Sequence, residues 1–306
     1  MLVCVPNFSF GTGPTRFGGF AASGAPESNQ MAAATPPGPP ASLAEHVSSV
    51  ARHRGASILD IHSDPDHNRT VITLAQQGEG IVESVVAAAE VAFEFIDINT
   101  HVGVHPRLGV ADVIPFVPVG GASMDDAIKA ALDCAERLHA ETGVPCFLYE
   151  AAARPGRPRD LPAIRRSAFK GLVPDIGDPR PHPTLGVAVV GARKPLVAYN
   201  VRLDSRDFSV ARQIAHAIRG PHVRALGFEL ASKESVQVSC NLTSPGETTI
   251  GDVYDAIRAM ASELGVAIAD AEVVGLVTSN SITGRDYASL GLSAAPKILE
   301  DETDSV

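Results

Sequence analysis

The order of the expected strands and helices constrains the fold of this chain more than any other sequence feature. β-rich runs and amphipathic stretches follow one another as strand, helix, strand, strand, helix, strand, and this order occurs twice. In the first half, the elements are expected at Leu2–Pro6, Ser42–Arg52, Ser57–Ile61, Thr70–Leu74, Ile81–Phe95 and Gly109–Val119. In the second half, they are expected at Pro195–Leu203, Asp207–Arg219, Val223–Leu230, Val236–Leu242, Ile250–Leu264 and Val266–Val277. Each half therefore has the element order of a split β-α-β unit.

This order predicts an α+β fold with a duplicated ferredoxin-like architecture, whose subdomains comprise residues 1–193 and 194–306. A helix at Met124–Thr142 and a strand at Val144–Tyr149 are expected to extend the first subdomain. Pro115 and Pro118 in the strand before them indicate an edge or a strand terminus. Residues 11–40, rich in Gly, Ala, Ser and Pro, are expected to form a flexible insertion, and the acidic residues 300–306 a frayed end.

Charge and cysteine content limit the expected partners and compartment. The formal net charge is −10, and phosphate binding needs clustered Lys and Arg, so no nucleic-acid partner is expected. The four cysteines form no CxxC pair, which favours reduced thiols in the cytoplasm. Charged residues, glycines or prolines interrupt every apolar run, so no membrane partner is expected. The segment Met1–Pro6 is expected to be a strand and not a signal peptide.

Two histidines four residues apart, His101 and His105, form the first candidate site. On a helix this spacing would place both rings on one face, as metal ligands often are. Gly103 and Pro106 interrupt a helix, however, so we expect a loop that enters a strand. One catalytic histidine with a neighbour is therefore favoured over a metal pair, because histidine can both remove and return a proton near neutral pH. Hydrogen bonding within a turn is the alternative.

Two other polar segments leave a functional and a purely structural interpretation open. The segment Asp60–Thr70 contains two histidines and three aspartates, which could bind a metal. A turn stabilised by aspartate side chains is the more ordinary interpretation, whereas Arg69 is a candidate for gripping a carboxylate. The proline-rich segment Asp175–Gly186 could contact a ligand or could link the two halves. The basic turn Gly191–Lys194 could face an anionic ligand or be solvated.

A polar face is expected on one strand of the second half. Side chains alternate along a strand, so Gln237, Ser239 and Asn241 share one face while Val238 and Cys240 share the other. Such a face either lines a cavity or is open to water.

Taken together, several motifs resemble the formiminotransferase family in their order along the chain. They extend from Val3 to about Val277. The motifs are Val3-Cys4-Val5-Pro6-Asn7-Phe8-Ser9, Asp66-His67-Asn68-Arg69-Thr70, His105-Pro106-Arg107-Leu108-Gly109, Asp112-Val113-Ile114-Pro115-Phe116, Gly191-Ala192-Arg193, Ala198-Tyr199-Asn200 and Val236-Gln237-Val238-Ser239-Cys240-Asn241-Leu242.

The resemblance implies a folate-binding groove between two ferredoxin-like subdomains, and a homodimer. It implies transfer of a formimino group between N-formimino-L-glutamate and tetrahydrofolate, a reaction of histidine breakdown and one-carbon metabolism, with no metal. His105 matches the family's catalytic histidine. The segment that matches the folate-contacting loop comprises Gly177, Asp178, Pro179, Arg180, Pro181, His182, Pro183, Thr184, Leu185 and Gly186. The candidates for substrate binding are Asn7, Asp60, Asn68, Arg69, Arg107, Gln237 and Asn241.

Three positions depart from the family's usual residues. Val102 and Val104 stand where the family usually has a lysine and a glutamate, and Phe10 stands where it usually has a glutamate. The chain has no room for a cyclodeaminase domain, so that activity is not expected. Two alternatives to the transferase remain: a non-catalytic folate-binding relative, and a metal-dependent amidine or amide hydrolase. The hydrolase would use the histidines His62, His67, His101 and His105.

Overall fold

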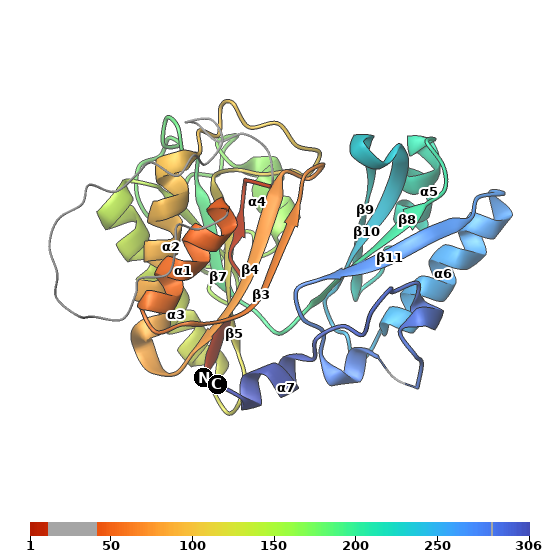
Figure 1. Cartoon of the computed structure of the whole chain (residues 1–306). Helices are drawn as coiled ribbons and strands as arrows, with labels where there is room; N and C mark the ends of the chain where they lie inside the picture. The colour runs from red at the N-terminus through yellow and green to blue at the C-terminus, as the bar shows by residue number, and fades with distance from the viewer. Residues whose placement is uncertain (12–41, 283) are drawn as a thin grey trace, which may run out of the picture.

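The computed structural model describes residues 1–11, 42–282 and 284–306, which form two β-sheets with helices (Figure 1). The insertion expected at 11–40 lies outside the described residues apart from Gly11. The first half contains β1 (Leu2–Cys4), β2 (Asn7–Phe8), α1 (Leu43–His53), β3 (Ser57–Asp64), β4 (Arg69–Gln76), α2 (Ile81–Phe95), β5 (Ala111–Pro118), α3 (Met124–Thr142), β6 (Cys146–Glu150), α4 (Leu161–Ser167) and β7 (Ala188–Ala192). The second half contains β8 (Val197–Leu203), α5 (Phe208–Ala217), β9 (Val223–Leu230), β10 (Ser235–Leu242), α6 (Ile250–Glu263), β11 (Ile268–Val274) and α7 (Leu299–Asp304).

The two sheets place corresponding strands in the same spatial order. In the second sheet the order is β11-β8-β10-β9, with all neighbours antiparallel. In the first sheet, β1 and β2 both lie between β4 and β5, and β3 pairs with β4 on its far side. If β1 and β2 are counted as one interrupted strand, each half has four corresponding strands. Numbered along the chain, these strands lie in the spatial order fourth, first, third and second in both sheets. The expected β-α-β-β-α-β order is therefore present in each half.

The first sheet is longer because two parallel strands extend it. β7 pairs in parallel with β5, and β6 pairs in parallel with β7. The sequence analysis did not anticipate β7, whose residues are all buried and carry no polar–apolar alternation.

An edge position for β5, one of the two expectations drawn from its prolines, is wrong. β5 is interior, with β1 and β2 on one side and β7 on the other. Pro115 lacks an N–H donor, but its carbonyl accepts from Val5 N–H at 3.1 Å, at the interruption between β1 and β2. The other expectation holds for Pro118, which ends the strand.

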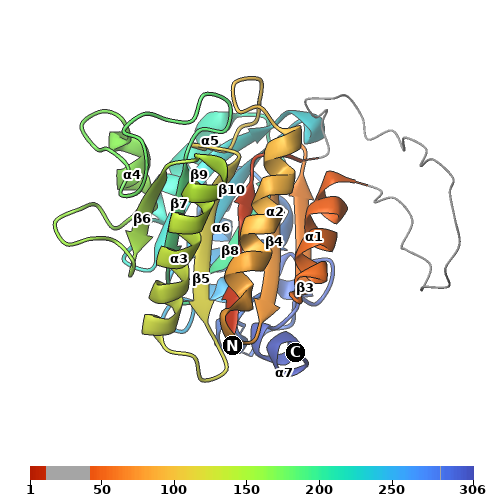
Figure 2. The ribbon, with the colours of Figure 1, turned by 90° about the vertical axis from the view of Figure 1, so that its left-hand side faces the viewer.

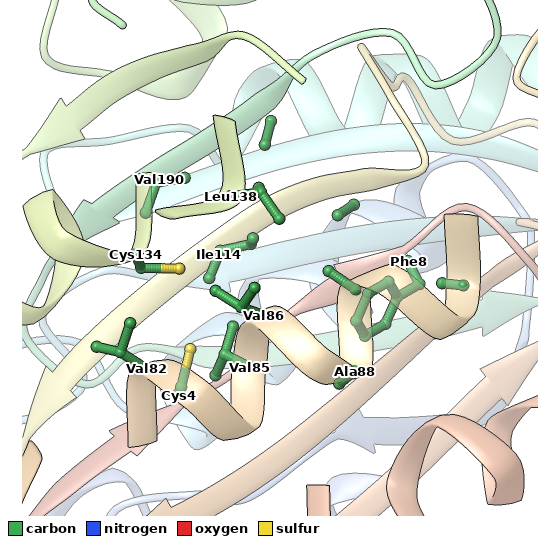
Figure 3. Close-up of a cluster of buried hydrophobic side chains, with 14 of the residues drawn as sticks. Cys4, Phe8, Val82, Val85, Val86, Ala88, Ile114, Cys134, Leu138 and Val190 are labelled. Atoms are coloured by element: carbon green, nitrogen blue, oxygen red, sulfur yellow. The ribbon is translucent and has the colours of Figure 1, made fainter. Parts of the chain in front are cut away.

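Strict alternation gives each sheet two different faces. In β4, Ile72 and Leu74 enter a core with α1, α2 and α3, whereas Arg69, Val71 and Thr73 point to the opposite face. Figure 2 shows these three helices crossing the outer face of the first sheet. Figure 3 shows part of this core, in which Cys4, Val85, Ile114 and Cys134 lie close together. All four cysteines are free and buried.

The second half has a separate core between its sheet and helices α5 and α6. Val201, Val238 and Cys240 belong to this core, together with Ile214 and Ile257 from the helices. In Figure 1, α1, α2 and α3 of the first half and α5 and α6 of the second half lie outermost, and the two sheets lie between them. The inner faces of the two sheets therefore look toward each other. None of the described helices is long and apolar enough to cross a membrane.

The C-terminal segment returns to the first sheet, where the sequence had indicated a frayed end. α7 lies at the lower end of both halves near the N-terminus (Figure 1). Leu299 packs with Val3, Leu59 and Val117, and Lys297 Nζ donates to the Leu59 carbonyl at 2.7 Å. The frayed end expected at 300–306 is therefore wrong, because buried apolar contacts hold a helix there.

Candidate active site

A cavity of about 540 Å³ lies between the inner faces of the two sheets. Its polar and charged lining comes from both halves. From the first half it includes Asn7, His62, Asp64, His67, Arg69, Thr73, His105, Tyr149, Glu150, Arg159, Arg165 and Arg193. From the second half it includes Lys194, Asn200, Arg224, Ser239, Asn241, Thr243 and Glu272. The polar face expected on β10 thus lines this cavity with Ser239 and Asn241.

His105 reaches the cavity from the loop that precedes β5. Its Nδ1 lies 2.8 Å from the Pro106 carbonyl oxygen. Because a carbonyl can only accept, Nδ1 carries the hydrogen, and Nε2 of the neutral ring has a free lone pair. The ring lies 5.8 Å from His67 and 5.7 Å from Phe228 on β9, centroid to centroid. Residues of both halves therefore set the position of the His105 ring.

The surroundings of His105 favour its neutral form. Burial, and then the positive charges of Arg69 and Arg165, hold the pKa of His105 well below its usual range. Asp112 opposes this effect only in part. At neutral pH the ring is therefore uncharged and able to accept a proton at Nε2.

Beside His105, one buried carboxylate anchors two arginines. Arg69 Nη1 donates to Asp112 Oδ2 at 2.8 Å, and Arg165 Nη2 donates to the same oxygen. Asp112 Oδ1 accepts from Leu108 N–H at 2.7 Å. Burial alone would raise the pKa of Asp112, but the charges of Arg165 and Arg69 outweigh it and lower the pKa. Two cations share one anion, so this group carries a net positive charge.

Asn7 and Arg69 line the cavity together. Asn7 Oδ1 accepts from Arg69 Nη2 at 2.9 Å and from Nε at 3.2 Å. Nη1 is occupied by Asp112, so the orientation of the guanidinium group is fixed on three sides.

Arg107 does not line the cavity; its side chain forms hydrogen bonds within the His105 loop. Its Nη1 donates to the carbonyls of Gly103 and His105, at 3.0 and 3.1 Å, and its Nη2 donates to that of His101 at 2.6 Å. Gly103 is packed so tightly that an added Cβ would lie 2.4 Å from the His67 carbonyl oxygen. The close approach at Gly103 and the three bonds of Arg107 hold this loop in place.

Asn68 and Asp60 also lie outside the cavity lining. Asn68 has a positive φ of 46° and ties three segments together. Its Oδ1 accepts from Gly11 N–H at 2.6 Å, its Nδ2 donates to the Val102 carbonyl at 2.9 Å, and its own carbonyl oxygen lies 2.8 Å from His101 Nε2. Asp60 Oδ1 accepts from Lys297 Nζ at 3.1 Å.

A chain of side-chain contacts crosses from the first half to the second. His67 Nε2 lies 2.9 Å from Gln237 Oε1, and Gln237 Nε2 donates to Glu272 Oε1 at 3.2 Å. Asn200 Nδ2 donates to the same oxygen at 3.1 Å. His62 Nε2 lies 4.0 Å from Glu272 Oε2. Gln237, which links His67 to Glu272, is buried and does not line the cavity.

The segment 177–186 lies at the same end of the first sheet as the His105 loop. Its second part packs on that loop: Val110 N–H donates to the Leu185 carbonyl at 2.9 Å, and Gly186 forms a bridge with Gly109. An added Cβ at Gly186 would lie 2.2 Å from the Leu108 carbonyl oxygen. Residues 177–181 are exposed, and none of the segment lines the cavity.

The four histidines considered as metal ligands do not form one cluster. His101 is bonded to the Asn68 carbonyl, and His62 lies beside Glu272, whereas His67 and His105 lie side by side. Among the residues the structure describes, no group of three or more His, Cys, Asp or Glu side chains could hold a metal ion.

Comparison with known proteins identifies the family of this chain. Residues 39–193 match the formiminotransferase domain, N-terminal subdomain, and residues 197–288 match the formiminotransferase domain. The chain belongs to the formiminotransferase family. It is similar to the glutamate formimidoyltransferase of Streptococcus pyogenes serotype M1, with 37% identity over 74% of this chain and 81% of that protein. It is also similar to the glutamate formimidoyltransferase of Thermoplasma acidophilum, with 39% identity over 74% of this chain and 79% of that protein.

A longer relative matches only in part. The formimidoyltransferase-cyclodeaminase of Rattus norvegicus is 37% identical over 75% of this chain, and the match covers 46% of that protein.

The three departures from the usual formiminotransferase residues have different surroundings. Phe10 is buried and its ring stacks 5.7 Å from Phe8, so an apolar residue fits there. Val102 is 82% exposed and Val104 is 40% exposed, both on the His105 loop. Neither valine lines the cavity.

Sequence reasoning missed several charged residues of the site. Arg159 lies before α4 and Arg165 lies within it, in a stretch so rich in arginine, proline and glycine that neither arginine stood out. Glu272 lies on β11, and its alternation with Ala271 and Val273 was the available sign that it faces inward. Tyr149, which precedes the last residue of β6, packs in a buried apolar cluster and also lines the cavity.

Proposed function

We propose that this chain transfers a formimino group between N-formimino-L-glutamate and tetrahydrofolate, with His105 as general acid and base. The membership in the formiminotransferase family and the similarity to glutamate formimidoyltransferases support the reaction. The cavity between the two sheets, which His105 lines, supports the location.

The state of His105 is the observation that carries this proposal. Its Nδ1–H is bonded to a carbonyl, and its lowered pKa keeps Nε2 unprotonated at neutral pH. An amine that attacks the amidine carbon forms a tetrahedral intermediate with three nitrogens. One nitrogen then loses a proton and the leaving nitrogen gains one. His105 Nε2 can serve both steps, which contributes about 10²- to 10⁴-fold to the rate.

Binding both substrates in one cavity lowers the entropic barrier of their reaction. Among the substrate-binding candidates, Asn7, Arg69 and Asn241 line the cavity, and we assign the substrate contacts to these three. Of the other candidates, Asn68 and Arg107 hold the His105 loop, Gln237 contacts His67 and Glu272, and Asp60 binds Lys297. We assign folate binding to the segment 177–186, whose second part packs on the His105 loop.

The same proposal includes the organisation of the protein. Residues 1–193 and 194–306 form two ferredoxin-like subdomains with a ligand groove between them, and the enzyme acts as a homodimer in the cytoplasm. The two separate cores support this division. General acid–base chemistry on an amidine requires no metal.

The test is His105→Ala, with His216→Ala as the control because His216 is exposed on α5. We expect kcat/KM for 5-formiminotetrahydrofolate formation to fall about 10²- to 10⁴-fold in His105→Ala and to stay unchanged in the control. An equally active His105→Ala variant would exclude the assigned role.

A wild-type protein that binds tetrahydrofolate but transfers nothing would be a non-catalytic relative. Loss of wild-type activity with a chelator, with recovery on adding zinc or manganese, would favour the hydrolase alternative.

A further inference from the structure

The cavity is electrically asymmetric, and this asymmetry follows from how the two sheets face each other. His62 on β3 lies 4.0 Å from Glu272 on β11, while Glu150 at the end of β6 pairs with Arg224 on β9 at 3.4 Å. These are edge strands in both sheets. One flank of the cavity is therefore formed by β3 and β11, and the other by β6 and β9.

Positive charge is concentrated on the β6–β9 flank. Within the described lining, five of the six lysines and arginines belong to α4, to the segment before it, to the residues directly after β7, or to β9. They are Arg159, Arg165, Arg193, Lys194 and Arg224. This flank suits the carboxylates of a glutamate-containing substrate.

Among the three carboxylates in the described cavity lining, Glu272 alone combines partial exposure with the lack of an arginine or lysine partner. Asp64 is buried, and its Oδ1 accepts from His67 N–H at 2.7 Å. Glu150 is paired with Arg224. Glu272 uses Oε1 for Gln237 and Asn200, and within the described residues Oε2 makes no hydrogen bond. The Glu272 side chain is 31% exposed.

The position of Glu272 is fixed relative to the proposed catalytic histidine. Its Oε1 is held by Gln237, whose other amide atom contacts the His67 ring. That ring packs against His105. Gln237, Asn200 and His67 are all buried, so the carboxylate is oriented by a rigid set of neighbours.

A formimino group carries the complementary charge. A formimino group attached to an amine nitrogen forms an amidine, which is protonated at neutral pH. The resulting amidinium is a planar cation with several N–H donors and resembles a guanidinium group. Such a cation pairs well with a carboxylate, and this pairing is stronger than a neutral hydrogen bond. The corresponding formyl group is a neutral amide and lacks this charge.

We propose that Glu272 binds the amidinium of the formimino donor through Oε2, and that it thereby selects a formimino group over a formyl group. The second half of the chain thus contributes the specificity-determining carboxylate, while the first half contributes His105. This inference rests on the proposed function, because it takes the donor to be a formimino compound.

The test compares two ligands that differ in this charge, N-formimino-L-glutamate and N-formyl-L-glutamate, binding to the wild type and to Glu272→Gln. The glutamine keeps an oxygen that accepts from Gln237 and Asn200 but removes the charge. By titration calorimetry, we expect Kd for the formimino ligand to rise about 10- to 100-fold. The Kd for the formyl ligand should change less than about threefold.

Asp270→Asn is the matched control, because Asp270 lies on the same strand but pairs with Arg202 outside the cavity. It should leave both Kd values unchanged. Equal weakening of both ligands by Glu272→Gln would mean that Glu272 only shapes the cavity, and no weakening would mean that it makes no contact; either result overturns the inference. A wild type that binds N-formimino-L-glutamate but transfers nothing would overturn the proposed function while leaving the role of Glu272 measurable.

Discussion

The two halves of the molecule share one strand order but differ in how they treat charge. In the first half, Asp112 is fully buried and holds Arg69 and Arg165 beside the cavity. In the second half, Asp255 on α6 also pairs with two arginines, Arg258 and Arg285, but on an exposed surface. Similar pairings therefore have different surroundings: the buried one positions two cations beside His105, and the exposed one lies on the surface of a helix.

Removing the two aspartates tests this contrast with the largest expected effect. Asp112→Ala leaves two largely buried guanidinium groups without their anion, which should lower the free energy of unfolding by about 3–5 kcal/mol. Asp255→Ala removes a solvent-screened pair and should cost no more than about 1 kcal/mol. Urea denaturation of both variants measures the difference. Equal losses would mean that burial does not distinguish the two sites.

A second comparison concerns how the halves are joined. Leu299 comes from the C-terminal segment but packs on the first sheet beside Val3 and Val117. Leu299→Ala removes buried apolar atoms at the edge of a core and should cost about 2–3 kcal/mol. Leu226→Ala on β9 removes an exposed side chain and should cost less than about 0.5 kcal/mol. Thermal unfolding of both variants measures the difference. Equal Tm values for Leu299→Ala and Leu226→Ala would show that the C-terminal segment does not join the two halves.

The smallest predicted effect is a shift in pH dependence. The charge of Arg165 is one cause of the lowered pKa of His105, so Arg165→Met should raise that pKa. His105 acts as a base only when neutral, so kcat/KM falls as the pH drops through its pKa. The acid limb of the profile should therefore move to higher pH in Arg165→Met. Arg166→Met, an exposed neighbour on α4, should leave the limb in place, whatever either variant does to the maximal rate.

The sequence predicted the element order well, because helices such as Ile81–Phe95 and Met124–Thr142 have long periodic patterns and clear ends. It failed where tertiary contacts decide. β7 is a short apolar run without alternation, and α7 is an acidic helix whose Leu299 packs on the first sheet. The interior position of Pro115 depends on the interruption of the neighbouring strand, which no local pattern records.

The site was predictable to a similar degree. The sequence singled out His105, Arg69 and the polar face of β10, because histidine, arginine and strand alternation are local signals. It could not place Arg107, whose guanidinium turns into its own loop, nor Asn68, whose positive φ ties three segments together. Glu272 becomes a candidate only when β11 is seen opposite β3.

We propose that His105 acts as a neutral base whose free lone pair is on Nε2. The most direct measurement is a ¹⁵N NMR titration of the His105 ring in the free protein. We expect a hydrogen on Nδ1 and none on Nε2 at pH 7, and a pKa of His105 that lies below the ordinary histidine value of about 6.5 and coincides with the acid limb of kcat/KM. A ring that carries its hydrogen on Nε2, or one that is protonated at pH 7, would contradict this proposal.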